Sequence, residues 1–92
     1  MTDTYAATML NLKPGDRLPN GATLVVYRYN PASLDGVVLA KWEKAWGTEW
    51  IVWSVYRHDA RSTGGGDYCR SCDEARAGFD SRASQRGATV VV

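Results

Sequence analysis

The sequence predicts a single small α+β domain, in which a three- to four-stranded antiparallel sheet packs one face against one C-terminal helix. Two observations predict this class. Three β-branched and aromatic segments follow one another with short connections, which is typical of an antiparallel meander. One later segment carries helix-capping residues and an apolar stripe. A chain of 92 residues matches one domain, 1–92, in which residues 1–22 are expected to form an irregular N-terminal segment.

The three central strands are expected at residues 23–29, 37–43 and 49–57, which read TLVVYRY, VVLAKWE and EWIVWSVYR. Turn-forming residues separate them, because proline presets φ and glycine accepts a positive φ. KPGD and PNG precede the first strand, Asn30-Pro31 ends it, and residues 44–47 connect the second strand tightly to the third. Residues 58–66 contain three consecutive glycines and are expected to form a mobile loop.

The helix is expected to begin at Ser71 and to end at Gly87. Ser71 and Glu74 fit the capping box S-x-x-E, and Gly87 suits the left-handed conformation of a C-cap. The spacing of the apolar residues gives one narrow stripe, formed by Cys72, Ala75, Phe79 and Ala83. Residues 67–70 and 88–92 each fit a short extended segment.

Both faces of the expected sheet are apolar, because side chains alternate along a strand and neither set is polar. In the third strand the two sets are Ile51, Trp53 and Val55 against Trp50, Val52 and Tyr56. In the first strand they are Leu24 and Val26 against Val25, Tyr27 and Tyr29. One helix covers one face, and we expect that face to carry the larger side chains. For the other face the alternatives are that the N-terminal residues lie across it, that the C-terminal valines extend the sheet, or that a partner or a second copy covers it.

Four tryptophans lie within residues 42–53. Trp50 and Trp53 fall on opposite faces and Trp46 lies in a turn, so the four cannot share one core, although any single one could fill it. Trp, Tyr and Arg are enriched at binding hot spots, and exposed apolar patches mark interaction sites. The expected partner-binding residues are Trp46, Trp50, Tyr56, Arg57, Arg61 and Arg70.

No catalytic residue, cofactor site or metal site is expected, so the sequence indicates a protein that is not an enzyme. His58 is the only histidine, and the three-glycine run lacks the Lys-Ser/Thr of a phosphate loop. Cys69 and Cys72 form one C-x-x-C motif, which leaves a redox pair, a zinc site and structural thiols as alternatives. Zinc would need two more ligands, for which His58 and Asp67 are the candidates.

The net charge of +1 argues against a strongly basic nucleic-acid-binding protein. No stretch reaches the roughly 20 apolar residues of a membrane helix, and the first residues lack a signal-peptide pattern. We therefore expect a cytoplasmic protein that does not contact membranes. Arginines interleaved with aromatic residues keep contact with an RNA or DNA backbone open, and a homodimer is a further alternative.

The segments EWIVWSVYRHDA and CDEARAGFDSRA give the chain a layout that resembles small accessory proteins of phages and other mobile elements. In size and in lacking catalytic motifs, the chain is similar to the anti-CRISPR proteins among them. This resemblance implies an inhibitor that sterically blocks a larger protein or ribonucleoprotein complex, such as a CRISPR effector, in the host-cell cytoplasm. The family shares no sequence motif, so it assigns no residue a role. A nucleic-acid-associated regulatory protein is the alternative function.

Overall fold

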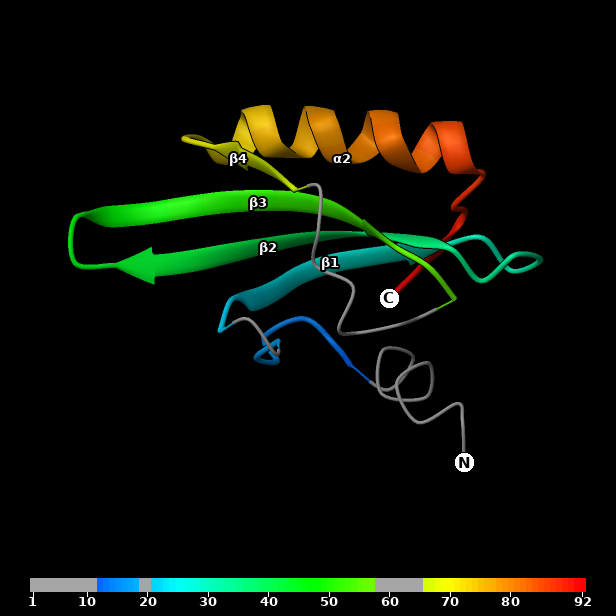
Figure 1. The fold of residues 1–92 in the computed structure, drawn as a ribbon, viewed down its shortest axis with the longest axis horizontal. Coiled ribbons are helices and arrows are strands. Elements are labelled where there is room, and N and C mark those ends of the chain that lie inside the picture. Colours follow the sequence, from blue (N-terminus) through cyan, green and yellow to red (C-terminus); the bar gives the residue numbers. More distant parts are fainter. Residues whose placement is uncertain (1–11, 19–20, 58–65) are drawn as a thin grey trace.

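A computed structural model describes residues 12–18, 21–57 and 66–92 (Figure 1). Five strands form one antiparallel sheet in the order β4-β3-β2-β1-β5, and one helix lies across a face of it. The elements are β1 (Thr23–Tyr29), β2 (Gly36–Lys44), β3 (Gly47–Val55), β4 (Asp67–Cys69), α2 (Cys72–Arg86) and β5 (Val90–Val91). The predicted α+β class, a meander with one helix near the C-terminus, is confirmed. Two short strands extend the central three, one at each edge of the sheet.

The third strand ends earlier than predicted, at Val55 rather than at residue 57. Arg57 has φ +52°, a left-handed conformation that turns the chain out of the sheet, and its N–H donates to Asp35 Oδ1 at 3.2 Å. Tyr56 lies in this turn and is exposed, so its predicted place on the same strand face as Trp50 is wrong.

Helix α2 begins and ends where its capping residues predicted. Ser71 Oγ accepts the N–H of Glu74 at 3.2 Å, which satisfies a backbone donor of the first turn. Gly87 has φ +65° and its N–H donates to the Ser84 carbonyl at 3.3 Å. The predicted stripe is the buried side of the helix, where Ala75, Phe79 and Ala83 contact the sheet.

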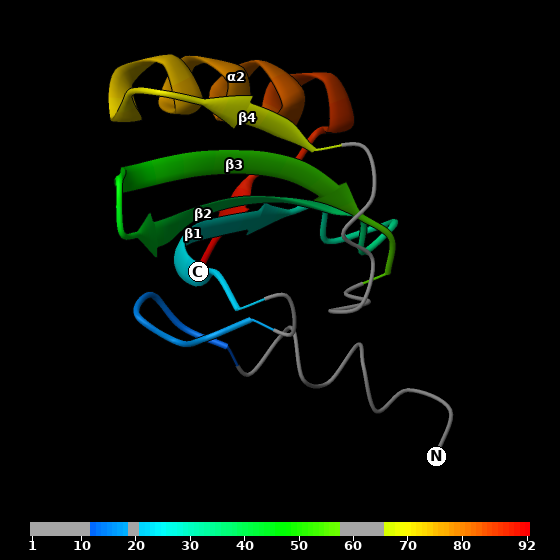
Figure 2. The ribbon, with the colours of Figure 1, turned by 60° about the vertical axis from the view of Figure 1, so that its left-hand side comes forward.

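A hydrophobic core lies on each face of the sheet. On the α2 face, Val37, Leu39 and Val52 pack against the helix, whereas the opposite face carries Tyr27 and Trp53. The prediction that the helix covers the larger side chains is wrong. Its two buried alanines leave little space above the sheet and fit small side chains beneath them. Figure 2 shows residues 12–18 on the far side from α2, where Leu18 packs into the second core.

A β-bulge in β1 changes which of its residues share a face. Leu24 pairs with Ala40 and Val26 with Leu39, so the register shifts at Val25. Val25 and Val26 both pack toward the α2 core, while Leu24 belongs to the opposite core. The predicted placement of Leu24 with Val26 is therefore wrong, because one extra residue reverses the alternation.

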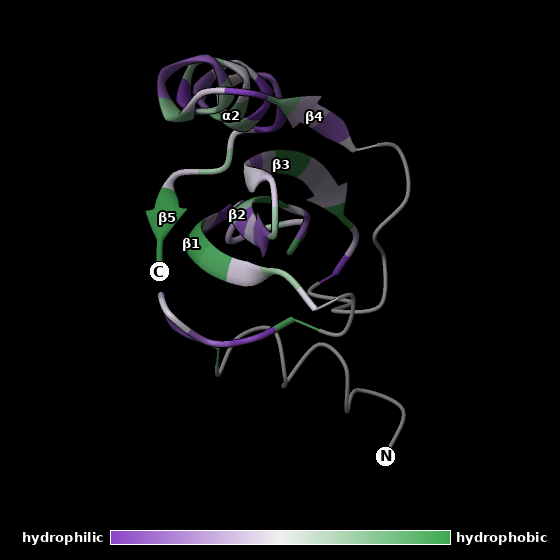
Figure 3. Ribbon diagram, turned by 90° about the vertical axis from the view of Figure 1, so that its left-hand side faces the viewer, coloured by the Kyte–Doolittle hydropathy of each residue, from purple (hydrophilic) through white to green (hydrophobic). Residues whose placement is uncertain are grey.

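The C-terminal valines extend the sheet at the edge beyond β1. Val90 pairs with Tyr29 and Val91 with Arg28, and Figure 3 shows the hydrophobic residues of β5 beside β1. Asn30 Nδ2 donates to the Arg86 carbonyl at 2.8 Å, which fixes the end of α2 to the end of β1. The expected extension of the sheet by the C-terminal valines is thus confirmed, and Val92 also packs against the core on the face opposite α2.

Candidate interaction surface at the hairpin tip

The hairpin formed by β2 and β3 is buried at one end and exposed at the other. Residues 36–40 and 51–55 are all buried, whereas residues 45–48 are exposed. Because β1 begins at Thr23, which pairs with Lys41, the following residues of β2 project beyond β1 (Figure 1). We call residues 42–49 the hairpin tip. The fold therefore presents this tip past the packed part of the molecule.

Two indole rings of the tip flank one ammonium group. Lys44 Nζ lies 4.0 Å from the centroid of the Trp42 ring and 5.5 Å from the centroid of the Trp46 ring. Cation–π attraction at these distances holds the lysine and the two rings together. Trp42 is half-buried, whereas Trp46 is 75% exposed. The tip thus carries a large aromatic surface that is held in place but not covered.

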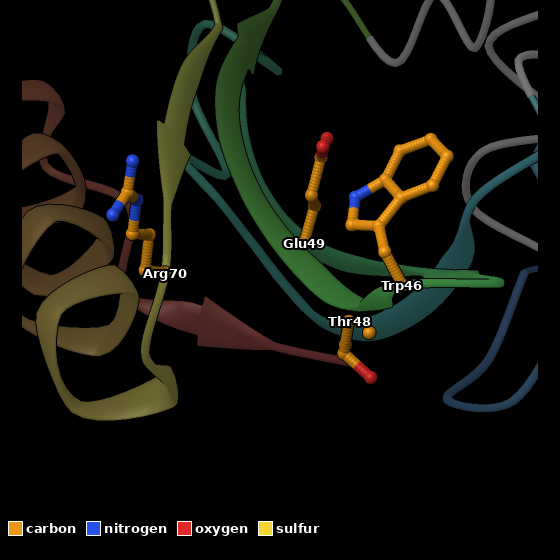
Figure 4. Close-up of a pocket in the computed structure, with 5 residues that line it drawn as sticks. Trp46, Thr48, Glu49 and Arg70 are labelled. Carbon is orange, nitrogen blue, oxygen red and sulfur yellow. The ribbon is translucent and has the colours of Figure 1, made fainter.

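A cavity of about 360 Å³ lies beside Trp46, lined by Trp46, Gly47, Thr48, Glu49 and Arg70. In Figure 4 Trp46 of the turn and Glu49 of β3 extend from the same side of the hairpin, while Arg70 stands apart after the end of β4, toward α2. Neither Glu49 nor Arg70 has an ion-pair partner among the described residues. The cavity therefore offers an exposed aromatic ring, together with a carboxylate and a guanidinium that have no ion-pair partner among the described residues.

The chain on both sides of Arg70 is fixed by α2. Arg82 Nη2 donates to Asp67 Oδ2 at 2.8 Å and Arg82 Nη1 donates to Ser54 Oγ at 3.1 Å, so one guanidinium joins the helix to β3 and β4. Ser71, which follows Arg70, is the N-cap of the helix. These contacts hold the backbone of Arg70 beside the hairpin tip although its side chain is exposed.

The structure divides the predicted partner-binding residues between the two ends of β3. Trp46 and Arg70 line the cavity, and Trp50 is close to it but packs half-buried against the α2 core. Tyr56 and Arg57 follow the other end of β3, after Val55. Because β3 has nine residues, this end is on the order of 30 Å from the cavity. Arg61 lies outside the described residues. The described members therefore do not form one continuous surface.

Three residues of the tip were missed by the sequence prediction. Lys44, Thr48 and Glu49 lie at the cavity or against its aromatic ring, yet none was singled out. The predicted turn at residues 44–47 contained a signal that could have found them. Residues that flank a two-residue turn are neighbours across the hairpin and lie beside the exposed ring at its end.

The surroundings of Cys69, the first cysteine of the C-x-x-C motif, do not favour a reactive thiolate. Burial, with the carboxylates of Glu74 and Asp67 nearby, raises the pKa of the Cys69 thiol. A raised pKa lowers the thiolate fraction, whereas reactive cysteines have a lowered pKa. Asp67, a candidate zinc ligand, accepts a hydrogen bond from Arg82, and the other candidate, His58, lies outside the described residues. Within the described ranges no three His, Cys, Asp or Glu side chains gather to hold a metal ion.

Two further findings concern the chain rather than the hairpin tip itself. In the part of the chain that the structure describes, no helix is both long enough and apolar enough to cross a membrane. Comparison of the chain with protein-family models, with curated proteins and with solved structures found no match. The geometry of the hairpin tip is therefore the basis on which a function is proposed.

Proposed function

We propose that this protein is a non-enzymatic binding protein that blocks a larger protein or ribonucleoprotein complex by inserting the hairpin tip into it. The observation that carries the proposal is the 75% exposure of Trp46 at the end of a projecting hairpin. Tryptophan is among the residues most enriched at binding hot spots. A large indole that the fold exposes here contributes nothing to either core, which is the arrangement expected of a residue kept for a partner.

The Lys44 contact supports the same reading. An aromatic anchor that is already held in position loses less conformational freedom on binding, so more of its contact energy appears as affinity. The 4.0 Å and 5.5 Å distances from Lys44 Nζ to the two indole centroids place Trp46 in such a pre-organised cluster. The tip is therefore suited to enter a recess as a rigid projection.

A protein surface is favoured over nucleic acid as the contact. Binding to a phosphate backbone depends on a concentration of basic side chains. Lys44 of the tip and Arg70 beside it are offset by Glu43 and Glu49, and the whole chain has a net charge of +1. The nucleic-acid-associated regulator thus stays a second candidate, and a CRISPR effector is the partner that the resemblance to anti-CRISPR proteins implies.

The test uses purified, reconstituted CRISPR effector complexes and measures cleavage of target DNA in the presence of the full chain. The wild type should inhibit at least one effector, and Trp46→Ala should weaken binding to it by roughly 30-fold, as expected for a hot-spot residue. Val91→Ala is the matched control, because Val91 is 62% exposed on the opposite edge strand, and it should inhibit like the wild type.

Two outcomes would count against the proposal. Equal inhibition by Trp46→Ala and the wild type would exclude the hairpin tip as the binding surface. Absence of binding to every effector tested would exclude this class of partner. Circular dichroism of each variant shows whether a loss of inhibition comes from unfolding.

A further inference from the structure

The strand β3 is longer than the neighbour that covers its outer edge. β4 pairs with Trp50, Ile51 and Val52 only. After Cys69 the chain leaves the sheet, because Arg70 leads directly into Ser71, which caps α2, and neither residue pairs with β3. Among the described residues, residues 47–49 therefore have a strand partner only on the β2 side. The cavity lies at this uncovered stretch of edge.

The direction of the backbone groups shows what this stretch can bind. In an antiparallel ladder, alternate residues direct their N–H and C=O to alternate neighbours. Gly47 pairs with Lys44 across the turn, so the backbone groups of Gly47 point toward β2. The N–H and C=O of the next residue, Thr48, therefore point away from β2, as do those of Trp50 and Val52, which face β4. Cys69 is opposite Trp50, and no strand of the described residues lies opposite Thr48, because the chain turns into the helix at Ser71. The N–H and C=O of Thr48 thus point to this edge of β3, and Thr48 also lines the cavity.

We infer that the uncovered edge at residues 47–49 and the cavity beside it, together called the notch, bind an extended segment of a partner protein. This segment continues the line of β4 and adds a strand to β3. The inference rests on the proposed function and deepens it by naming what the tip binds. Addition of a strand to an exposed edge gains affinity from backbone hydrogen bonds and specificity from alternate side chains. Thr48 supplies the backbone pair, and the flanking side chains supply the specificity.

The charges around the notch define the sequence that fits it. Side chains of an added strand alternate between the two faces of the sheet. On one face they meet Trp46 and Glu49, and on the other they approach Arg70 (Figure 4). The segment that fits best carries an acidic residue directed to Arg70. The adjacent residue is basic or aromatic and is directed to Glu49 and Trp46. Such a segment pairs the charge of Arg70 and satisfies Glu49 or the Trp46 ring. The mixed signs exclude a purely anionic ligand as the best fit.

A second copy of the chain fits the notch less well than a free peptide segment. The uncovered edge is three residues long, residues 47–49, and a second copy carries the same β4 beside it. Edge-to-edge pairing would therefore stop within these three residues, and an interface of this length falls short of the roughly 1,000 Å² that a stable one needs. An extended segment without a neighbouring strand meets no such obstacle.

The test selects binders from a library of displayed random 12-residue peptides with the full-length protein as bait. The best peptide is then synthesised in a series of copies, each with one backbone nitrogen methylated. A strand that pairs with Thr48 should lose affinity by about tenfold or more when an inward-facing N–H is methylated, and little at the adjacent positions. Loss at every position alike, or enrichment of no peptide, would overturn the inference.

A pair of variants separates the backbone of Thr48 from its side chain. Thr48→Pro removes the outward N–H at an edge position where proline is tolerated, whereas Thr48→Val keeps the N–H and removes the hydroxyl. Thr48→Pro should lose about tenfold in affinity for the selected peptide and Thr48→Val should keep it. Equal binding by both variants would overturn strand addition.

The two proposals fail in different ways. If Trp46→Ala loses effector binding while Thr48→Pro binds the effector like wild type, the tip is the binding surface and strand addition is excluded. If peptides bind with the expected alternation but no effector is inhibited, strand addition stands and occlusion of such a complex fails. Binding of single-stranded oligonucleotides at the same site, in place of peptides, would exclude strand addition and favour the nucleic-acid alternative.

Discussion

The two halves of the β2–β3 hairpin share one ladder and have opposite surroundings. The register is unbroken from Gly36 opposite Val55 to Lys44 opposite Gly47. In the inner half every residue of 36–40 and 51–55 is buried, because α2 covers one face and the segment around Leu18 covers the other. The outer half extends past these covering elements. Burial in this domain is therefore set by the length of the covering layers rather than by the strands themselves.

The comparison separates stability from recognition. Trp53 in the inner half is 1% exposed and Trp46 in the outer half is 75% exposed, although both belong to the same hairpin. A buried aromatic contributes a large area to the core, whereas an exposed one contributes to stability only through local contacts. Substitutions in the inner half should unfold the protein, and substitutions in the outer half should change what it binds.

The largest contrast is expected from the two tryptophans. Trp53→Ala removes the largest fully buried side chain and should lower the free energy of unfolding by about 3–5 kcal/mol. Trp46→Ala should lower it by less than about 0.5 kcal/mol, because the ring is exposed. Urea titrations of both variants measure the difference. Similar losses for the two would mean that the hairpin tip belongs to the folded core.

A second contrast compares a glycine from each half. A Cβ at Gly36 would overlap the Tyr27 ring and lie 2.8 Å from the Arg28 carbonyl oxygen, so Gly36→Ala should cost about 1–3 kcal/mol. A Cβ at Gly47 meets nothing within 4 Å, and the cost of Gly47→Ala, about 1 kcal/mol, comes from its φ of +137°. Thermal unfolding should rank Gly36→Ala as the less stable variant, and the reverse order would contradict the close packing of Tyr27.

Alkaline pH should destabilise the protein through Tyr27 of β1, which is buried in the core that the inner half shares. Burial, together with the nearby charges of Tyr29 and Asp35, raises the pKa of Tyr27 well above its usual value near 10. The unfolded chain ionises this tyrosine near pH 10 and the folded chain does not, so the stability is intact below about pH 10 and is lost above it. The loss from this group should approach about 1.4 kcal/mol per pH unit.

Urea titrations from about pH 9 to about pH 11 measure this slope. Tyr27→Phe should flatten it even though the variant is less stable at neutral pH. Tyr68→Phe is the control, because Tyr68 is 65% exposed, and it should leave the slope as in the wild type. A slope that is the same in Tyr27→Phe as in the wild type would assign the alkaline loss to other groups.

The strands and the helix of the packed part of the molecule could be predicted from the sequence because their signals are local. β-Branched runs mark the strands, and Ser71 and Gly87 mark both ends of α2. The exposure of Trp46 also follows from a local signal, the turn beside Gly47. The bulge at Val25 could not be predicted, because the residues around it in β1 form an unbroken apolar run, and such a run fits either register.

The candidate site was only partly predictable because it joins segments that are distant along the chain. Arg70 lines the same cavity as Glu49 because of the position at which β4 docks on β3, and three residues, DYC, carry too little pattern to fix that register. The left-handed turn at Arg57 is equally hidden, since nothing in the sequence marks a non-glycine residue for positive φ. Those two features decide which arginine lies at the tip.

The smallest effects on stability are expected from substitutions of two lysines of β2. Lys44→Ala removes the ammonium between the two indoles and should cost about 0.5 kcal/mol of stability, as expected for an exposed cation–π contact. Lys41→Ala removes an exposed ion pair with Glu43, at 3.5 Å, and should cost a similar amount. Affinity for the selected peptide separates them, because only Lys44 holds Trp46 in place. Lower affinity for Lys44→Ala alone would show that the tip is pre-organised, and equal affinity for both would show that Trp46 binds without that support.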